Sequence, residues 1–476
     1  MLKINQLKLF LMIRKIYSDG FFDVNEKNGF LPIKEPLRYL PELYKSLQIF
    51  IDDLPILKDQ NNRGILSFKG EVEKRVANIT NFKNEVTLEK DPFIIQALFL
   101  CYAFITSSFT LAPAHFYFLE NNKYGKANVF LPNQIAEPFS IVAKKLDVYP
   151  FLDYHYAYSL GNYFKIDPKG GLNWENLGMA CSFSGMDDER GFIMLHVDIN
   201  QHSPNLVKSV IDLQNSNSDK QLNKALDLGY KTMIKINERR QLMWTASRWE
   251  HYNDFRIFIM GIKGNDEIFG DGLVYENVSD EPQKYRGQTG AQDNIIPLMD
   301  IFSGVINQYP KNELTHYLND LRSYRPMCIQ SFLEDTRVYF SEKSNSLIER
   351  LEHSNNFEGI LILLLLLDEI YAFRNGHWQF VQKYIMQNTV YPKATGGTPI
   401  ISWIPNQITA VLNTMEINFN KLPQKLIKSN LPFWKEEFDR KRSLLKKQLE
   451  ILNKKSYDPA KVYKLNKEMK LNDDKI

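Results

Sequence analysis

Cysteine is scarce in this chain, with three residues in 476, and no two of them form a CxxC pair. That spacing argues against a disulfide framework and against a zinc site built from thiolates. It is typical of a reducing compartment, so we expect a cytoplasmic protein. Glycine (23 residues) and proline (21) are also few, which excludes a disordered or collagen-like chain. The length suits two domains with separate large cores.

Long hydrophobic runs are missing as well. The most apolar run, residues 360–367, has eight residues, far fewer than the roughly 20 that cross a bilayer. Basic residues interrupt the apolar ones in the first 20 positions, which is unlike a signal peptide. We therefore predict a soluble protein with no membrane association.

Charge is nearly balanced, with 59 Lys+Arg against 56 Asp+Glu and a net charge of +3. The basic excess lies in residues 435–476, where 13 basic residues face 8 acidic ones. We interpret this tail as a solvated, basic amphipathic helix. Because the rest of the chain has no basic patch with interleaved aromatics, we expect no nucleic-acid partner.

Several common catalytic motifs are absent. The chain has no GxxxxGK[ST] phosphate loop, no GxGxxG, no HExxH and no GxSxG. Nucleotide, zinc-protease and serine-hydrolase chemistries are therefore disfavoured.

Helical periodicity is abundant, whereas strand patterns are sparse, so the predicted fold class is mainly α. Residues 264–292 form the longest irregular stretch. The predicted helical segments cover residues 1–30, 37–54, 71–79, 92–109, 191–214, 220–247, 248–263, 293–307, 312–322, 344–353 and, at the greatest length, 357–388.

An apolar stripe on this longest helix carries a histidine. Positions 366, 370, 373, 377, 380 or 381, and 384 recur at helical spacing, so His377 projects from an otherwise apolar face. Two interpretations stay open from the residues alone. His377 could be a hydrogen-bonded core residue, the more frequent case, or the proximal ligand of a haem iron. In the second case Arg374, one turn earlier, could pair with a haem propionate.

Five sequence segments occur together in a characteristic order: GMDDERGFIMLHVDI (185–199), FRIFIMGIKGN with DGLVYE (255–276), YRGQTGAQDNIIP (285–297), HWQFVQKYI (377–385) and ATGGTPIISWIPNQ (394–407). With LPNQIAEPFSIVAKKLDVYP (131–150), they resemble the indoleamine 2,3-dioxygenase family, haem enzymes that insert O2 into the pyrrole ring of tryptophan. The resemblance runs from about residue 29 to residue 407, and the basic tail lies outside it.

The resemblance implies a small N-terminal domain (1–172), a large helical domain (173–434) that holds haem b, and a basic helical tail (435–476). It implies that His377 is the proximal iron ligand, and it places Arg374, Thr289 and Gly396 at the cofactor. Arg256 matches the family's substrate-carboxylate arginine, and a guanidinium suits that task because it can donate two parallel hydrogen bonds.

Other residues match the substrate pocket of the family. Thr395 and Gly396 match a glycine-rich loop that closes over the substrate. Gly290, with Thr289, matches the segment at the indole and haem edge. Phe192 matches a distal aromatic residue, and Tyr158 and Ser159 match the wall contributed by the small domain.

Two positions depart from the family pattern. His251, with Tyr252 beside it, stands where the family often has a pocket phenylalanine, which changes the expected shape of the indole pocket. His196 stands four residues after Phe192, where many members carry a small hydroxyl residue. On a helix these two residues share a face, so we expect His196 in the distal pocket as a catalytic group; a structural histidine near the domain surface is the alternative.

The resulting hypothesis is a haem-dependent dioxygenase that converts L-tryptophan and O2 to N-formylkynurenine. Its partners would be these two substrates and an electron donor that keeps the haem ferrous, and we expect a monomer. Two alternatives stay open: a related haem enzyme of secondary metabolism that acts on a substituted tryptophan or indole, and a non-catalytic haem-binding sensor.

Overall fold

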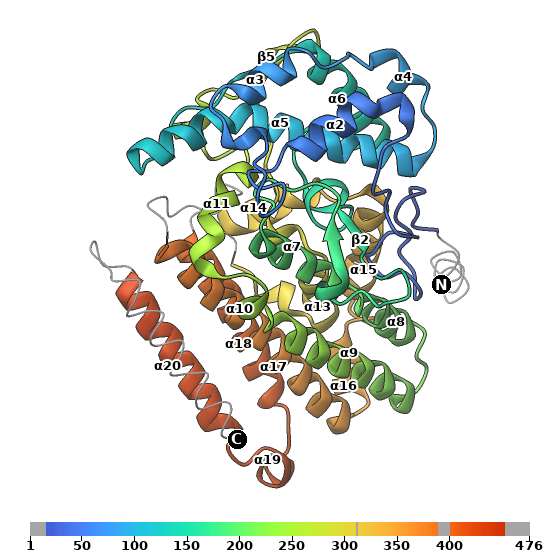
Figure 1. The fold of residues 1–476 in the computed structure, drawn as a ribbon. Coiled ribbons are helices and arrows are strands. Elements are labelled where there is room, and N and C mark those ends of the chain that lie inside the picture. Colours follow the sequence, from blue (N-terminus) through green and yellow to red (C-terminus); the bar gives the residue numbers. More distant parts are fainter. Residues whose placement is uncertain (1–15, 311–312, 389–399, 453–476) are drawn as a thin grey trace.

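Helices dominate the computed structural model, which describes residues 16–310, 313–388 and 400–452 (Figure 1). The predicted mainly α class is confirmed. Buried apolar side chains from nearly every element form one contiguous core.

The N-terminal helices gather at one end of the molecule (Figure 1). They are α2 (Lys45–Asp53), α3 (Glu71–Val76), α4 (Lys83–Leu88), α5 (Pro92–Asn121) and α6 (Asn133–Leu146).

The remaining helices build the larger part of the fold. They are α7 (Asp187–Asn200), α8 (Ser203–Gln214), α9 (Asp219–Arg240), α10 (Met243–Ala246), α11 (Tyr252–Arg256), α12 (Asp266–Phe269), α13 (Ile295–Ser303), α14 (Glu313–Arg322), α15 (Met327–Ser341), α16 (Leu347–His353), α17 (Phe357–Phe380), α18 (Ile400–Phe419), α19 (Gln424–Asn430) and α20 (Trp434–Leu452).

Helix α5 is the central helix of the N-terminal part. The Asp91 side chain accepts from the backbone N–H groups at its start, Pro92 occupies the first turn, and Asn122 ends it with a φ of 52°. The helix is long and apolar enough to cross a membrane by length and composition, although no such segment was predicted. However, 89% of its most apolar window is buried in the fold, so we describe α5 as a core helix.

Short strands connect the two parts. Strand β1 (Phe130–Leu131) pairs in parallel with β4 (Leu273–Tyr275), which pairs with β5 (Ser279–Gln283); β2 (Tyr163–Lys165) pairs with β3 (Leu177–Met179). The β1–β4 pair therefore crosses the predicted boundary at residue 172. Strands β4 and β5 also lie within residues 264–292, which we predicted to be irregular.

The predicted helix over residues 1–30 is wrong where the structure describes it, because residues 16–41 form turns and isolated bridges. Asp19 Oδ1 accepts from the N–H groups of Phe21 (2.9 Å) and Phe22 (2.7 Å), which offers the backbone an alternative to helical bonding. Gly20 and Gly29 adopt φ values of 89° and 57°, which also interrupt a helix.

Helix α20 differs from the solvated helix that we predicted. It lies along the outside of α17 and α18 (Figure 1) and buries part of its surface there. Gln448 Oε1 accepts from the buried Trp378 indole N–H at 2.9 Å, and Lys441 Nζ donates to Asp368 Oδ1 at 2.5 Å. One face of α20 therefore packs on the rest of the protein, while residues such as Lys446 stay exposed.

Candidate active site

Elements from distant parts of the chain enclose a cavity of about 280 Å³. Its wall comes from α7, from the short 3₁₀ helix η7 (Gly290–Gln292), from α13 and from α17 with the π-helical turn η9 (Val381–Met386) that follows it. More than half of the lining side chains are apolar or aromatic. The polar lining groups include His196, Thr289, Asp293, Asp300, Arg374 and His377.

The imidazole of His377 is accessible, although Gly376 and Trp378 on either side are buried. Because His377 lines the cavity, its accessible area faces that cavity. No described residue forms a hydrogen bond with either ring nitrogen. The protein around the cavity keeps most solvent from the ring, and this desolvation, helped by the positive charges of Arg240 and Arg374, lowers the pKa of His377 to about 4. The ring is therefore neutral near pH 7 and has a lone pair available, as a metal ligand must.

These features bear on the two interpretations of His377. Most buried polar side chains have a hydrogen-bond partner, and His377 has none in the part of the chain that the structure describes. Across those same residues, no group of three or more His, Cys, Asp or Glu side chains could hold a bare metal ion. A single imidazole in an apolar cavity fits an iron that a macrocycle already holds, because such an iron needs only an axial ligand from the protein.

Arg374 has a protein partner in the cavity wall. Its Nη1 donates to Asp300 Oδ1 at 3.0 Å and its Nη2 to Asp300 Oδ2 at 2.5 Å, while Nη2 also reaches the Tyr309 hydroxyl at 2.8 Å. Both charged side chains are almost fully buried. The Arg374 Nε–H has no partner among the described residues, so this group could still donate to an anionic part of a cofactor.

Phe192 and His196 lie one turn apart on α7 and both line the cavity. Phe192 packs in an aromatic cluster, with ring centroids 5.2 Å from Tyr252 and 5.7 Å from Phe255. His196 Nδ1 lies 3.2 Å from the Tyr154 hydroxyl oxygen, and burial lowers the pKa of its imidazole. His196 is therefore a neutral, hydrogen-bonded group within the cavity wall.

Thr289 and Gly290 also line the cavity. Thr289 caps η7, since its hydroxyl accepts from the Ala291 N–H and its own N–H donates to Gln292 Oε1. A Cβ added at Gly290 would contact only His196 Cε1, at 3.8 Å. The loop thus brings bare backbone close to the His196 ring.

Other predicted site residues lie outside this wall. Tyr158 is buried and its hydroxyl donates to Glu189 Oε1 at 3.3 Å, and Ser159 beside it is also buried. Arg256 is fully buried one turn after Tyr252, which does line the cavity, and its charge acts on that tyrosine. Thr395 and Gly396 lie outside the described residues.

The two neighbouring residues of the first departure from the family pattern, His251 and Tyr252, lie in different surroundings. Tyr252 lines the cavity, whereas the His251 Nδ1 lies 3.0 Å from Asp254 Oδ2, away from the cavity wall. Of these two residues, only Tyr252 contributes to the cavity wall.

Tyr154, Asp293 and Asp300 belong to the site but were not predicted from the sequence. Asp293 follows η7 within a segment that carried the resemblance, and Asp300 lies on the next helix. Neither aspartate belongs to a periodic pattern or a motif. Each acts through a partner that is distant in sequence, Tyr154 for Asp293 and Arg374 for Asp300.

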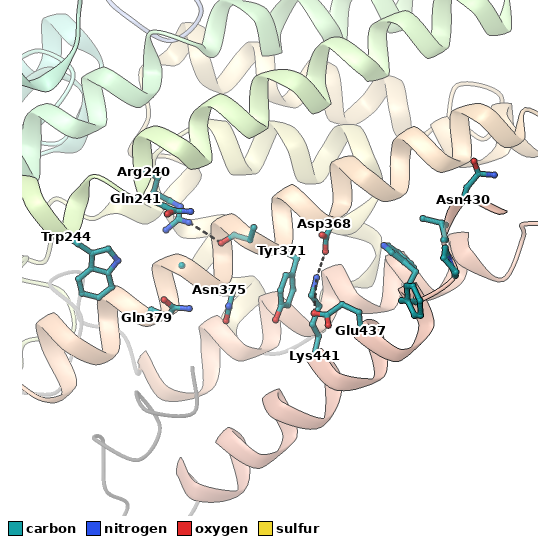
Figure 2. Close-up of a pocket in the computed structure, with 16 residues that line it drawn as sticks. Arg240, Gln241, Trp244, Asp368, Tyr371, Asn375, Gln379, Asn430, Glu437 and Lys441 are labelled. Atoms are coloured by element: carbon teal, nitrogen blue, oxygen red, sulfur yellow. Dashed lines mark hydrogen bonds and ion pairs between the residues drawn. The ribbon is translucent and has the colours of Figure 1, made fainter. Parts of the chain in front are cut away.

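A second cavity, of about 490 Å³, lies on the other face of α17 (Figure 2). Helix α17 lines it with Ala372, Asn375, Gly376 and Gln379, and α20 closes one side with Glu437 and Lys441. Its described lining includes no histidine or cysteine. We therefore place the active site in the cavity that holds His377.

Comparison with known proteins shows the family of the chain. The sequence model of the family described as "Indoleamine 2,3-dioxygenase" matches residues 19–406. Indoleamine 2,3-dioxygenase 1 of Mus musculus is 24% identical, covering 81% of this chain and 92% of its own length. Indoleamine 2,3-dioxygenase 2 of Homo sapiens is 25% identical (79% and 86%), and indoleamine 2,3-dioxygenase nanC of Aspergillus nanangensis is 24% identical (84% and 97%). The chain belongs to the indoleamine 2,3-dioxygenase family and is a haem-dependent dioxygenase.

Proposed function

We propose that this protein cleaves the C2–C3 bond of the L-tryptophan indole with O2 and releases N-formylkynurenine. The observation that carries the proposal is the His377 imidazole, neutral and without a partner among the described residues, in a cavity that also contains Phe192 and His196. Family membership favours an enzyme over the non-catalytic sensor considered above.

The residues of the cavity fit haem b. His377 would hold the iron, Arg374 Nε and the Thr289 loop would contact the edge of the group, and the apolar walls would cover its faces. When bound, the haem would supply the activation of O2 and the exchange of electrons that the side chains cannot provide.

The chain itself would bind and orient the amino acid. Phe192 and Tyr252 present aromatic faces on which an indole ring can pack. Arg256 would hold the carboxylate and Thr395 with Gly396 would close over the substrate, as the family resemblance implies. Fixing the indole in this way would increase the reaction rate, because a reactant that is already correctly oriented does not lose further entropy in the transition state.

The test is the product formed from L-tryptophan by the reduced, haem-loaded protein. With 18O2, mass spectrometry should find N-formylkynurenine that carries both labelled atoms. A product with one labelled atom, or no product under conditions in which haem is bound, would contradict the proposal.

A substituted tryptophan is the second candidate substrate. Tyr252 in the cavity wall favours it, because a phenol at this position could donate a hydrogen bond to a ring substituent. Comparing kcat/KM for L-tryptophan and for its ring-hydroxylated derivatives decides between the two substrates.

We further propose a monomeric cytoplasmic enzyme that depends on an external electron donor to keep the iron ferrous. The three cysteines support a reducing compartment, since all are free and buried. Gel filtration with light scattering and cell fractionation test the oligomeric state and the compartment.

A further inference from the structure

Three side chains from separate elements form a hydrogen-bonded chain that ends at the cavity. The Tyr154 hydroxyl oxygen lies 2.7 Å from Asp293 Oδ2 and 3.2 Å from His196 Nδ1. Tyr154 comes from the π-helical turn η3 (Tyr154–Tyr158), Asp293 follows η7 and His196 lies on α7. Tyr154 therefore connects the Asp293 carboxylate to the His196 imidazole in the cavity wall.

The donors around Asp293 fix the direction of these bonds. Its Oδ1 accepts from the Ile295 N–H at 2.8 Å, and its Oδ2 accepts from Asn200 Nδ2 at 2.8 Å in addition to Tyr154. An ionised carboxylate only accepts, so the Tyr154 O–H must point to Asp293. Burial and the negative charge of Asp293 raise the pKa of Tyr154 well above its ordinary value, so the phenol keeps this proton.

The hydroxyl of Tyr154 has one proton, which it gives to Asp293, so its oxygen can only accept from His196. The Nδ1 of His196 must then carry the hydrogen. In a neutral imidazole the other nitrogen, Nε2, has a lone pair and accepts. No described residue bonds to Nε2, and the ring faces the cavity beside Gly290.

We propose that Asp293 and Tyr154 are positioning residues that lock His196 in the Nδ1–H tautomer, so that its Nε2 accepts a hydrogen bond from a ring N–H of the substrate. This inference rests on the proposed function and narrows it. The substrate class becomes heteroaromatic amino acids with a free ring N–H.

The tautomer can be measured without turnover. We would record 15N spectra of the full chain, haem-free and labelled at histidine, and assign the His196 signals with His196→Ser. The expected pattern is a protonated Nδ1 and an unprotonated Nε2. Tyr154→Phe, which removes the acceptor, and Asp293→Asn, which replaces an obligate acceptor by an amide, should both abolish this fixed pattern.

Binding provides the functional readout. The probes are L-tryptophan and β-(3-benzothienyl)-L-alanine, which carries sulfur in place of the ring N–H, titrated calorimetrically into the ferric haem-loaded protein. Loss of one hydrogen bond should lower the preference for tryptophan by about 3–10-fold in Tyr154→Phe. The affinity for the sulfur analogue should stay unchanged.

Tyr156→Phe is the matched control. Tyr156 lies on the same turn and its hydroxyl donates to a different aspartate, Asp19 Oδ2, at 2.5 Å, outside the cavity wall. This variant should keep both the His196 tautomer and the ligand preference of the wild type.

An Nε2–H tautomer in the wild type, or an unchanged preference in both Tyr154→Phe and Asp293→Asn, would overturn this inference while leaving tryptophan cleavage intact. If instead the Nδ1–H tautomer is found but tryptophan is not cleaved, the proposed function fails and the positioning role of Tyr154 stands.

Discussion

The Arg374 guanidinium is held by the Asp300 carboxylate through two parallel hydrogen bonds, one turn before His377 on α17. Both side chains are buried, and Asp300 belongs to α13. The pair therefore connects two walls of the cavity and fixes the face of α17 that presents His377.

Breaking this pair should destabilise the protein. We expect Arg374→Leu to lower the free energy of unfolding by about 3–5 kcal/mol, because it leaves a buried, unpaired carboxylate. The double variant Arg374→Leu/Asp300→Leu should lose less stability, because it leaves no unpaired buried charge. Urea denaturation of the full chain measures both. As a control, Arg337→Leu removes a half-exposed ion pair with Glu334 and should cost less than about 1 kcal/mol.

Replacing His377 should weaken haem binding. His377→Ala removes the proposed iron ligand and leaves a space in the cavity wall, so added imidazole should restore part of the affinity for haem. Haem titration followed by absorbance measures this. His353→Ala and His316→Ala, which change exposed histidines, should bind haem like the wild type. A five-coordinate histidine-ligated spectrum in His377→Ala would contradict the assignment.

Arg256 should act through the substrate carboxylate. We expect Arg256→Leu to cost about 2–5 kcal/mol in kcat/KM for L-tryptophan, the range for truncating one partner of a buried charge pair. Tryptamine lacks the carboxylate, so its low kcat/KM should change little. Equal losses on both compounds would identify Arg256, which is fully buried, as a structural residue.

Stability should fall in acid because of buried neutral histidines. Burial lowers the pKa of His115 from 6.5 to about 4 and that of His155 to about 3. The unfolded chain gains these protons near pH 6.5, before the folded protein does, so the free energy of unfolding is highest above pH 6.5 and decreases as the pH falls toward 4. The slope is at most about 1.4 kcal/mol per pH unit for each ring.

Urea unfolding at pH 7.5, 6 and 5 measures this dependence. His115→Gln should make the decrease shallower, whereas His353→Gln at an exposed position should leave the wild-type slope. Equal slopes in all three proteins would show that His115 is protonated in the folded state.

The contact between α20 and α17 should also be measurable. Gln448→Leu leaves the buried Trp378 N–H without the acceptor at 2.9 Å, and an unsatisfied buried donor costs about 1–3 kcal/mol. Thermal unfolding should reveal this loss, while Lys446→Ala on the exposed face of α20 should have little effect. No change in Gln448→Leu would mean that α20 does not pack on α17 in solution.

The sequence by itself determined the elements that local periodicity governs. Helix α17 occurs where its apolar spacing predicts it, and the predicted stripe supplies Phe373, His377 and Tyr384 to the cavity. Phe192 and His196 share a face of α7 for the same reason. A period of 3.6 residues fixes the relative direction of side chains within one helix, whatever surrounds it.

Only the tertiary structure decided the partners of these side chains. Asp300 lies 74 positions before Arg374, and Asp293 lies 139 positions after Tyr154. No local pattern encodes such pairs, because they depend on how helices pack. The same reason explains two wrong predictions. The Asp19 side chain gave residues 16–30 a different hydrogen-bonding pattern from a helix, and packing against α17 buried one face of the helix that we predicted to be solvated.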